Sequence, residues 1–151
     1  MTDLRDLYQE VIFDHNRNPR NFGKLVDASH KAEGFNPLCG DRLTVYLKVD
    51  PDHGTITDVA FDGAGCAISV ASASLMTETL KGRTLAEAEA LFEGFHDLIM
   101  DQPAGADTPE LGKLRVLEGV KAFPSRVKCA TLSWHTMHAA LEGKDDSITT
   151  E

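Results

Sequence analysis

Apolar residues in the first segment of the chain, between Asp3 and His15, recur every three or four positions. This spacing places them on one face of a helix of roughly three turns. The sequence Asn16-Arg17-Asn18-Pro19 follows, and its proline ends the helical pattern. We therefore predict an amphipathic helix over residues 3–15.

Two later segments alternate apolar and polar residues, which is the period of a half-buried strand. They cover residues 43–49 and 57–61, with the turn-forming sequence Pro51-Asp52-His53-Gly54 between them. This arrangement predicts an antiparallel hairpin. Residues 30–35 are a candidate third strand.

The period changes after the sequence Gly63-Ala64-Gly65. Apolar and small residues then fall on one helical face from Ile68 to Leu80, and Gly82 is typical of a helix end. This prediction puts Cys66 at the start of a helix.

The next helix is predicted over residues 85–99. Thr84 and Glu87 have the spacing of a capping box, and they precede an apolar stripe of helical period. The stretch 101–109 is rich in Pro, Gly, Ala and Asp, which is typical of a surface loop.

The last part of the chain predicts two further helices. Three leucines within residues 111–117 indicate a short helix. Ser125 is the expected N-cap of a final helix, whose apolar face continues to Leu141. The sequence from Lys144 onward is polar, and we expect it to fray.

The order of these elements, with strands early and helices afterwards, predicts an α+β domain. We expect a small antiparallel sheet of about three strands with helices packed on one face. A chain of 151 residues is long enough for one domain with its own core. We assign residues 1–142 to a single domain and residues 143–151 to a polar tail.

Composition and charge narrow the class of protein. The formal net charge of −9 argues against nucleic acid as a partner, because binding to phosphates rests on Lys and Arg. No apolar run is long enough to span a membrane, and the first residues do not resemble a secretion signal, so we expect a cytoplasmic protein. In a reducing compartment, its three cysteines are better candidates for metal ligation or thiol chemistry than for disulfides.

The three cysteines and one aspartate form a candidate metal site. Cys39 and Asp41 are two residues apart, which in an extended segment directs both side chains to the same side. Cys66 begins one predicted helix and Cys129 lies in the first turn of another, where the helix dipole favours a thiolate. Three thiolates and one carboxylate suit four-coordinate zinc.

Alternatives to this site remain open from spacing alone. The spacing matches no standard zinc motif, and buried cysteines are often small core residues. Their positions at the ends of elements favour the metal site. His135 and His138 are rotated away from Cys129 on the predicted helix, so we do not expect them to be ligands. A hydrolase with Cys66 as its nucleophile is a weaker alternative, because no orienting motif accompanies it.

Three sequence segments hold the candidate ligands in order. They are Asn36-Pro37-Leu38-Cys39-Gly40-Asp41, then Gly63-Ala64-Gly65-Cys66-Ala67-Ile68-Ser69, and finally Arg126-Val127-Lys128-Cys129-Ala130. Together they resemble the U-type iron–sulfur cluster assembly family, and the similarity continues up to about Leu141. IscU-type scaffolds have histidine immediately before the third cysteine, where this chain has Lys128. The resemblance is therefore to the SufU branch.

The resemblance implies a SufU/IscU-like α+β fold with zinc held by Cys39, Asp41, Cys66 and Cys129. SufU-like proteins are zinc-dependent sulfur acceptors for a pyridoxal-phosphate cysteine desulfurase. By analogy, a histidine of that partner replaces Cys39 on the metal, and Cys39 then takes the terminal sulfur. Arg126 matches a position of the SufU pattern and is expected to pair with Asp41 when this carboxylate leaves the metal.

The resemblance thus predicts a zinc-dependent sulfurtransferase that works with a SufS-like desulfurase and with downstream iron–sulfur assembly proteins. Two alternatives remain. The first is an IscU-like scaffold that carries a transient iron–sulfur cluster. The second is a purely structural zinc module, which would unfold without its metal. The size of the predicted core argues against the structural module.

Overall fold

The computed structural model describes residues 4–36, 40–100, 114, 117, 120, 124–142 and 148–149. In chain order, the elements are α1 (Leu4–Arg17), β1 (His30–Asn36), β2 (Asp41–Asp50), β3 (Thr55–Ala64), α2 (Ala67–Leu80), α3 (Leu85–Ile99), α4 (Pro124–Leu141) and β4 (Ile148–Thr149). The predicted first helix, hairpin and third strand are confirmed, and so are three of the four helices predicted after them, with ends shifted by a few residues.

The sheet has the strand order β3-β2-β1-β4. β2 pairs antiparallel with both β3 and β1, which confirms the predicted three-stranded antiparallel sheet. The short strand β4 pairs parallel with β1 at Gly34 and Phe35, and the sequence analysis did not predict it. The prediction of a frayed tail is wrong for the two residues of β4, because β1 is an edge strand that offers them backbone partners.

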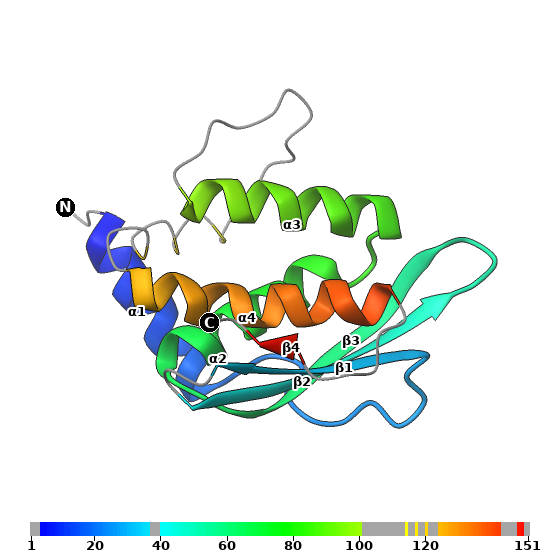
Figure 1. Cartoon of the computed structure of the whole chain (residues 1–151), viewed down its shortest axis with the longest axis horizontal. Coiled ribbons are helices and arrows are strands. Elements are labelled where there is room, and N and C mark those ends of the chain that lie inside the picture. The colour runs from blue at the N-terminus through cyan, green and yellow to red at the C-terminus, as the bar shows by residue number, and fades with distance from the viewer. Residues whose placement is uncertain are drawn as a thin grey trace.

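The helices lie on one face of the sheet, as predicted (Figure 1). α4 packs on β1 and β2, and α2 packs on β3 and α4. α3 packs on α4 on the side away from the sheet, and α1 packs on α2. α2 and α4 therefore lie between other elements, which explains why most of their side chains are buried.

The core lies between the sheet and these two central helices. Trp134 of α4 is fully buried and stacks on Phe95 of α3, with 4.8 Å between ring centroids. Gly34 of β1 lies so close to Thr136 of α4 that a Cβ atom there would overlap the threonine hydroxyl. The contact between α4 and β1 thus depends on Gly34 having no side chain.

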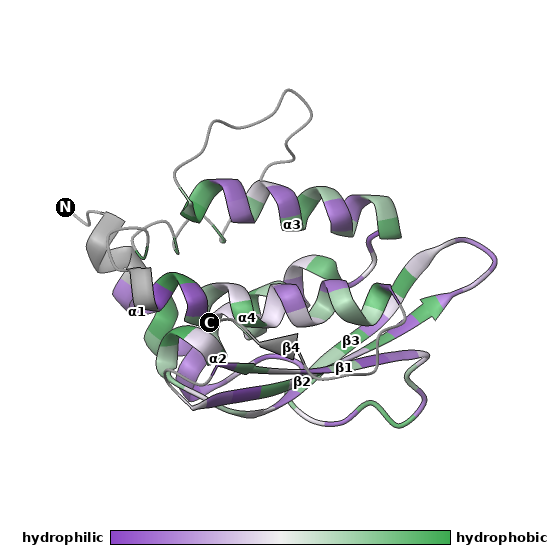
Figure 2. Cartoon of the chain, in the orientation of Figure 1, coloured by the Kyte–Doolittle hydropathy of each residue, from purple (hydrophilic) through white to green (hydrophobic). Residues whose placement is uncertain are grey.

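α3 shows alternating hydrophobic and hydrophilic bands in Figure 2, as expected for a helix with only one face on the core.

Two predicted helix starts have different outcomes. The capping box before α3 is confirmed, because the Glu87 amide donates to Thr84 Oγ1 and the Thr84 amide donates to Glu87 Oε1, each at 3.1 Å. The prediction of Ser125 as the N-cap of the last helix is wrong, because α4 begins at Pro124. Proline is favoured at the first helical position, where its missing N–H costs nothing.

The segment between α3 and α4 is described only in part. Leu114, Leu117 and Val120 have 3₁₀-helical backbone and are fully buried. The predicted loop 101–109 and the remaining residues of the short helix 111–117 lie outside the described residues. Within the described parts of the chain, no helix is both long and apolar enough to cross a membrane.

Candidate metal centre

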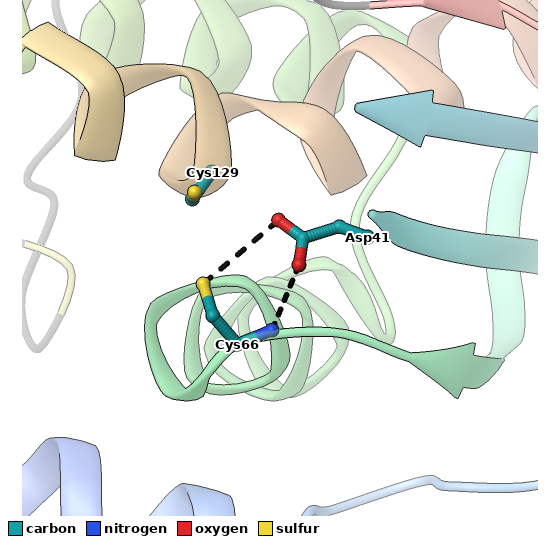
Figure 3. A group of neighbouring side chains, drawn as sticks. All are labelled: Asp41, Cys66 and Cys129. Atoms are coloured by element: carbon teal, nitrogen blue, oxygen red, sulfur yellow. Dashed lines mark hydrogen bonds between the residues drawn. The ribbon is translucent and has the colours of Figure 1, made fainter. Parts of the chain in front are cut away.

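Three side chains from distant parts of the sequence meet at one end of the sheet (Figure 3). They are Asp41 at the start of β2, Cys66 at the start of α2 and Cys129 in α4. One potential ligand atom from each lies within 4.8 Å of the other two. The contacts of α2 with β3 and of α4 with β1 and β2 bring these elements together.

Asp41 is fully buried, and both of its carboxylate oxygens face Cys66. Oδ1 accepts a hydrogen bond from the Cys66 amide at 2.8 Å, and Oδ2 lies 3.8 Å from the Cys66 thiol. Among the described residues, no cationic side chain forms an ion pair with Asp41. Buried carboxylates are normally paired with a cation or bound to a metal, so this arrangement favours a cation.

Glycines make room for this contact. A Cβ atom on Gly65 would lie 2.9 Å from Asp41 Oδ1, closer than side-chain carbons normally approach an oxygen. Gly63 has φ of +124°, a conformation that L side chains rarely adopt, and a Cβ there would overlap the Arg42 carbonyl oxygen. The Gly-Ala-Gly sequence is therefore required by the turn that delivers Cys66.

Cys66 is the N-cap residue of α2, which confirms its predicted position at a helix start. Its side chain makes no capping hydrogen bond and is half-buried. The thiol thus lies at the positive end of the helix dipole, where a thiolate is stabilised. Cys66 is the more accessible of the two described cysteines.

Cys129 is almost completely buried, with 2% of its surface exposed. It is the sixth residue of α4 and lies in the second turn of the helix, not in the first as predicted. The dipole argument is therefore weaker for Cys129, since the effect falls off within one turn. Another donor is present instead, because Asn36 Nδ2 lies 3.7 Å from Cys129 Sγ in hydrogen-bond geometry.

Asn36 is the residue of this centre that the sequence reasoning missed. It is fully buried at the end of β1 and pairs directly with Asp41 in the β1–β2 ladder. No local signal in the sequence marked Asn36, because its burial and its contact with Cys129, 93 positions away, arise only in the tertiary fold.

Three other predicted residues have different positions. Cys39 lies outside the described residues. Arg126 is exposed on α4, three residues before Cys129, and Lys128 is half-buried. The structure therefore brings together three of the four predicted ligands and leaves the role of Arg126 as a prediction.

His135 and His138 face α3, consistent with the prediction that they are not ligands. Both pack against the Phe92 ring, with centroid distances of 5.3 and 4.9 Å. Burial, together with the nearby charges of His96 and His138, lowers the pKa of His135. In the described part of the chain, Asp41, Cys66 and Cys129 form the one group with the geometry of a metal site.

The arrangement fits a zinc ion. Zinc–sulfur bonds of about 2.3 Å in a tetrahedron put neighbouring ligand atoms roughly 3.8 Å apart. The three ligand atoms already lie within 4.8 Å of one another, so small side-chain shifts would complete the coordination. Two thiolates and one carboxylate leave one position of a four-coordinate site for a further ligand.

Comparison with known proteins adds sequence and structural relatives. The family described as NifU-like N terminal domain matches residues 7–130. The chain is 43% identical over 135 residues to the zinc-dependent sulfurtransferase SufU of Bacillus subtilis (strain 168), covering 89% of each chain. It is 39% identical over 142 residues to the iron–sulfur cluster assembly scaffold protein IscU of Streptococcus pyogenes serotype M1, covering 94% of this chain and 87% of the relative.

A solved structure supports the same relationship. The crystal structure of an iron–sulfur cluster assembly scaffold protein for the SUF system from Fervidobacterium islandicum AW-1 matches with a TM-score of 0.81 and 36% sequence identity. The match covers 89% of this chain and 96% of that chain. The likeness thus extends over nearly the whole of both folds.

Proposed function

The chain belongs to the family of NifU-like N-terminal domains, which includes SufU and IscU proteins of iron–sulfur cluster assembly, and from this premise we propose that it is a zinc-dependent sulfur acceptor. In this proposal it takes sulfur from the persulfide of a pyridoxal-phosphate cysteine desulfurase of the SufS type. It then passes the sulfur to downstream iron–sulfur assembly proteins in the cytoplasm. This activity makes it a sulfurtransferase.

The observation that carries the proposal is the convergence of Asp41, Cys66 and Cys129. The carboxylate of Asp41 is buried and has no cationic partner among the described residues. Cys39 is the proposed fourth ligand. Two residues of chain span at most about 7 Å, so covalent connection keeps the Cys39 backbone close to Asp41. Bound zinc would hold the thiolates in place and damp their nucleophilicity.

The proposed transfer conserves atoms and charge. The Cys39 thiolate attacks the terminal sulfur of the desulfurase persulfide, and a new sulfur–sulfur bond forms on Cys39. The sulfur–sulfur bond of the desulfurase breaks at the same time, and the desulfurase cysteine leaves as a thiolate. The sulfane sulfur changes its carrier without any net oxidation or reduction. Cys39 must be an unligated thiolate at this moment.

We assign Arg126 a supporting role in this transfer. The guanidinium lies on the exposed side of α4, one helical turn before Cys129. When Asp41 is displaced from the metal, its carboxylate needs a new counter-charge, and an arginine can pair with it through two hydrogen bonds. Arg126 would therefore stabilise the open state of the site.

An IscU-like scaffold is the second candidate function. The Streptococcus relative favours it, because that protein is named as a cluster assembly scaffold. Lys128 argues against it, because the resemblance to IscU-type scaffolds implies a histidine immediately before the third cysteine. A purely structural zinc module is less well supported, because the fold has an extensive core away from the metal centre.

Metal analysis of the isolated protein, combined with a desulfurase assay, tests the proposal. We expect colourless protein with about one zinc ion per chain, in keeping with a single four-ligand site. Adding it to a SufS-type desulfurase with cysteine should increase turnover and label the protein with sulfane sulfur. Brown protein with near-stoichiometric iron and sulfide would instead establish the scaffold function.

A further inference from the structure

Asn36 joins the two sides of the metal centre through separate atoms. Its backbone carbonyl accepts a hydrogen bond from the Gly40 amide at 2.8 Å. Its side-chain amide lies on the other side, with Nδ2 3.7 Å from Cys129 Sγ. One fully buried residue therefore connects Gly40, next to Asp41, with α4.

The direction of this hydrogen bond distinguishes the two described cysteines. Asn36 Nδ2 can only donate, so Cys129 Sγ is the acceptor. A hydrogen bond to a thiolate is charge-assisted and stronger than one to a neutral thiol. Cys66 Sγ instead has a carboxylate oxygen of Asp41, an acceptor, at 3.8 Å. The protein thus supplies a side-chain donor to Cys129 and a side-chain acceptor to Cys66.

We propose that Asn36 is a positioning residue that keeps Cys129 as the fixed thiolate ligand of the site. The inference rests on the proposed zinc-dependent sulfur transfer. The amide orients Sγ toward Asp41 and Cys66 and withdraws electron density from its lone pairs. Cys129 therefore stays on the metal and does not attack a persulfide, so that incoming sulfur goes to Cys39.

Burial of Cys129 also favours transfer of sulfur to Cys39. Cys129 is 2% exposed, which limits its access to the persulfide of a partner protein. Breaking the contact would also cost the buried amide a hydrogen bond. The same cost opposes movement of Sγ away from its place. Asn36 thus orients Cys129 Sγ, stabilises its thiolate and opposes movement of Sγ away from the site.

The test compares Asn36→Ala and Asn36→Asp with the matched variant Asn21→Asp. Asn21 also donates its side-chain amide to a residue of a buried helix, Thr77 Oγ1 at 3.1 Å, but it lies away from the cysteines. Zinc affinity is measured by competition with a chelator. Alkylation rates of Cys66 and Cys129 are measured by mass spectrometry, both with and without zinc.

Removing an outer-shell partner typically lowers metal affinity about 10–100-fold, and we expect both Asn36 variants to fall in this range. Cys129 should be alkylated several-fold faster in these variants, and persulfide should appear on Cys129 after incubation with desulfurase and cysteine. Asn21→Asp should behave as wild type. Zinc affinity and Cys129 alkylation within twofold of wild type in both Asn36 variants would overturn the inference.

The alkylation of zinc-free protein separates this inference from the proposed function. If the wild type does not bind zinc, but Asn36→Ala still exposes Cys129, the proposed function fails and the positioning by Asn36 is supported. If both Asn36 variants misfold, the wild type loaded with NMR-active cadmium decides the matter. A scalar coupling between the metal and the Asn36 amide protons through Cys129 Sγ is expected, and its absence would refute the contact.

Discussion

The amide of Cys66 donates a hydrogen bond to Asp41 Oδ1 at 2.8 Å, across 25 positions of sequence. Asp41 is therefore both a candidate ligand and the residue that anchors the start of α2. Loss of its carboxylate should affect the metal and the fold in different proportions from loss of a cysteine.

We predict that Asp41→Ala lowers zinc affinity less than Cys66→Ala or Cys129→Ala, because a carboxylate is the hardest and most exchangeable ligand for zinc here. It should also lower the free energy of unfolding by about 1–3 kcal/mol, because the half-buried Cys66 amide loses its acceptor. Chelator competition and denaturant unfolding measure the two effects. Asp27→Ala, at an exposed site, should leave zinc affinity unchanged. Larger zinc loss in Asp41→Ala than in either cysteine variant would contradict the ranking.

Gly65→Ala tests whether the space beside Asp41 matters. Its new Cβ atom would lie 2.9 Å from Asp41 Oδ1, so the carboxylate must shift and zinc affinity should fall about tenfold or more. Gly54→Ala is the control, because Gly54 has φ of +62° but no atom near its missing Cβ. The control should lose stability through backbone strain and retain normal zinc affinity. Equal zinc affinity of the two variants would show that the close contact is not required.

Cys39 is predicted to carry the persulfide after incubation of the protein with desulfurase and cysteine. Peptide mapping under non-reducing conditions should find one added sulfur on Cys39 in preference to Cys66 and Cys129. Cys39→Ser should abolish stimulation of the desulfurase even where some zinc is retained, because oxygen cannot store sulfane sulfur. Sulfur found mainly on another cysteine, or full stimulation by Cys39→Ser, would refute the assignment of Cys39 as the sulfur acceptor. Neither result would contradict the metal site.

The stability of the fold should depend on pH through His135. Burial lowers the pKa of His135 in the folded state, so the unfolded state binds more protons below its ordinary pKa of about 6.5. Stability from this residue is present above that pH and is lost as pH falls toward the folded pKa. Unfolding free energies between about pH 7.5 and pH 5 should therefore decrease less in His135→Gln than in wild type.

His30→Gln is the control for the pH experiment, because it changes a half-exposed histidine at the start of β1. It should retain the pH slope of the wild type. The same slope in His135→Gln and wild type would show that another group accounts for the pH dependence.

Much of the fold was predictable from local patterns. Helical and strand periods identified α1 to α4, β2 and β3, because side chains on a core-facing surface must be apolar at a fixed spacing. Residues 30–35, which form most of β1, were only a candidate strand. The Thr84–Glu87 capping box was predictable for a similar reason, since both of its hydrogen bonds join residues three positions apart. The start of α4 was predicted wrongly because Ser125 is a residue type favoured at N-caps. The helix instead begins one residue earlier, at Pro124.

By itself, the sequence determined which residues are capable of metal and sulfur chemistry, because Cys39, Asp41, Cys66 and Cys129 are identified by their side chains and their flanking motifs. Only the tertiary structure decided that Asp41, Cys66 and Cys129 meet within 4.8 Å, that Asp41 is buried, and that Asn36 reaches Cys129. The physical reason is the range of the interactions. Periodicity and capping act between neighbours in sequence, whereas this centre depends on how α2 and α4 pack on the sheet.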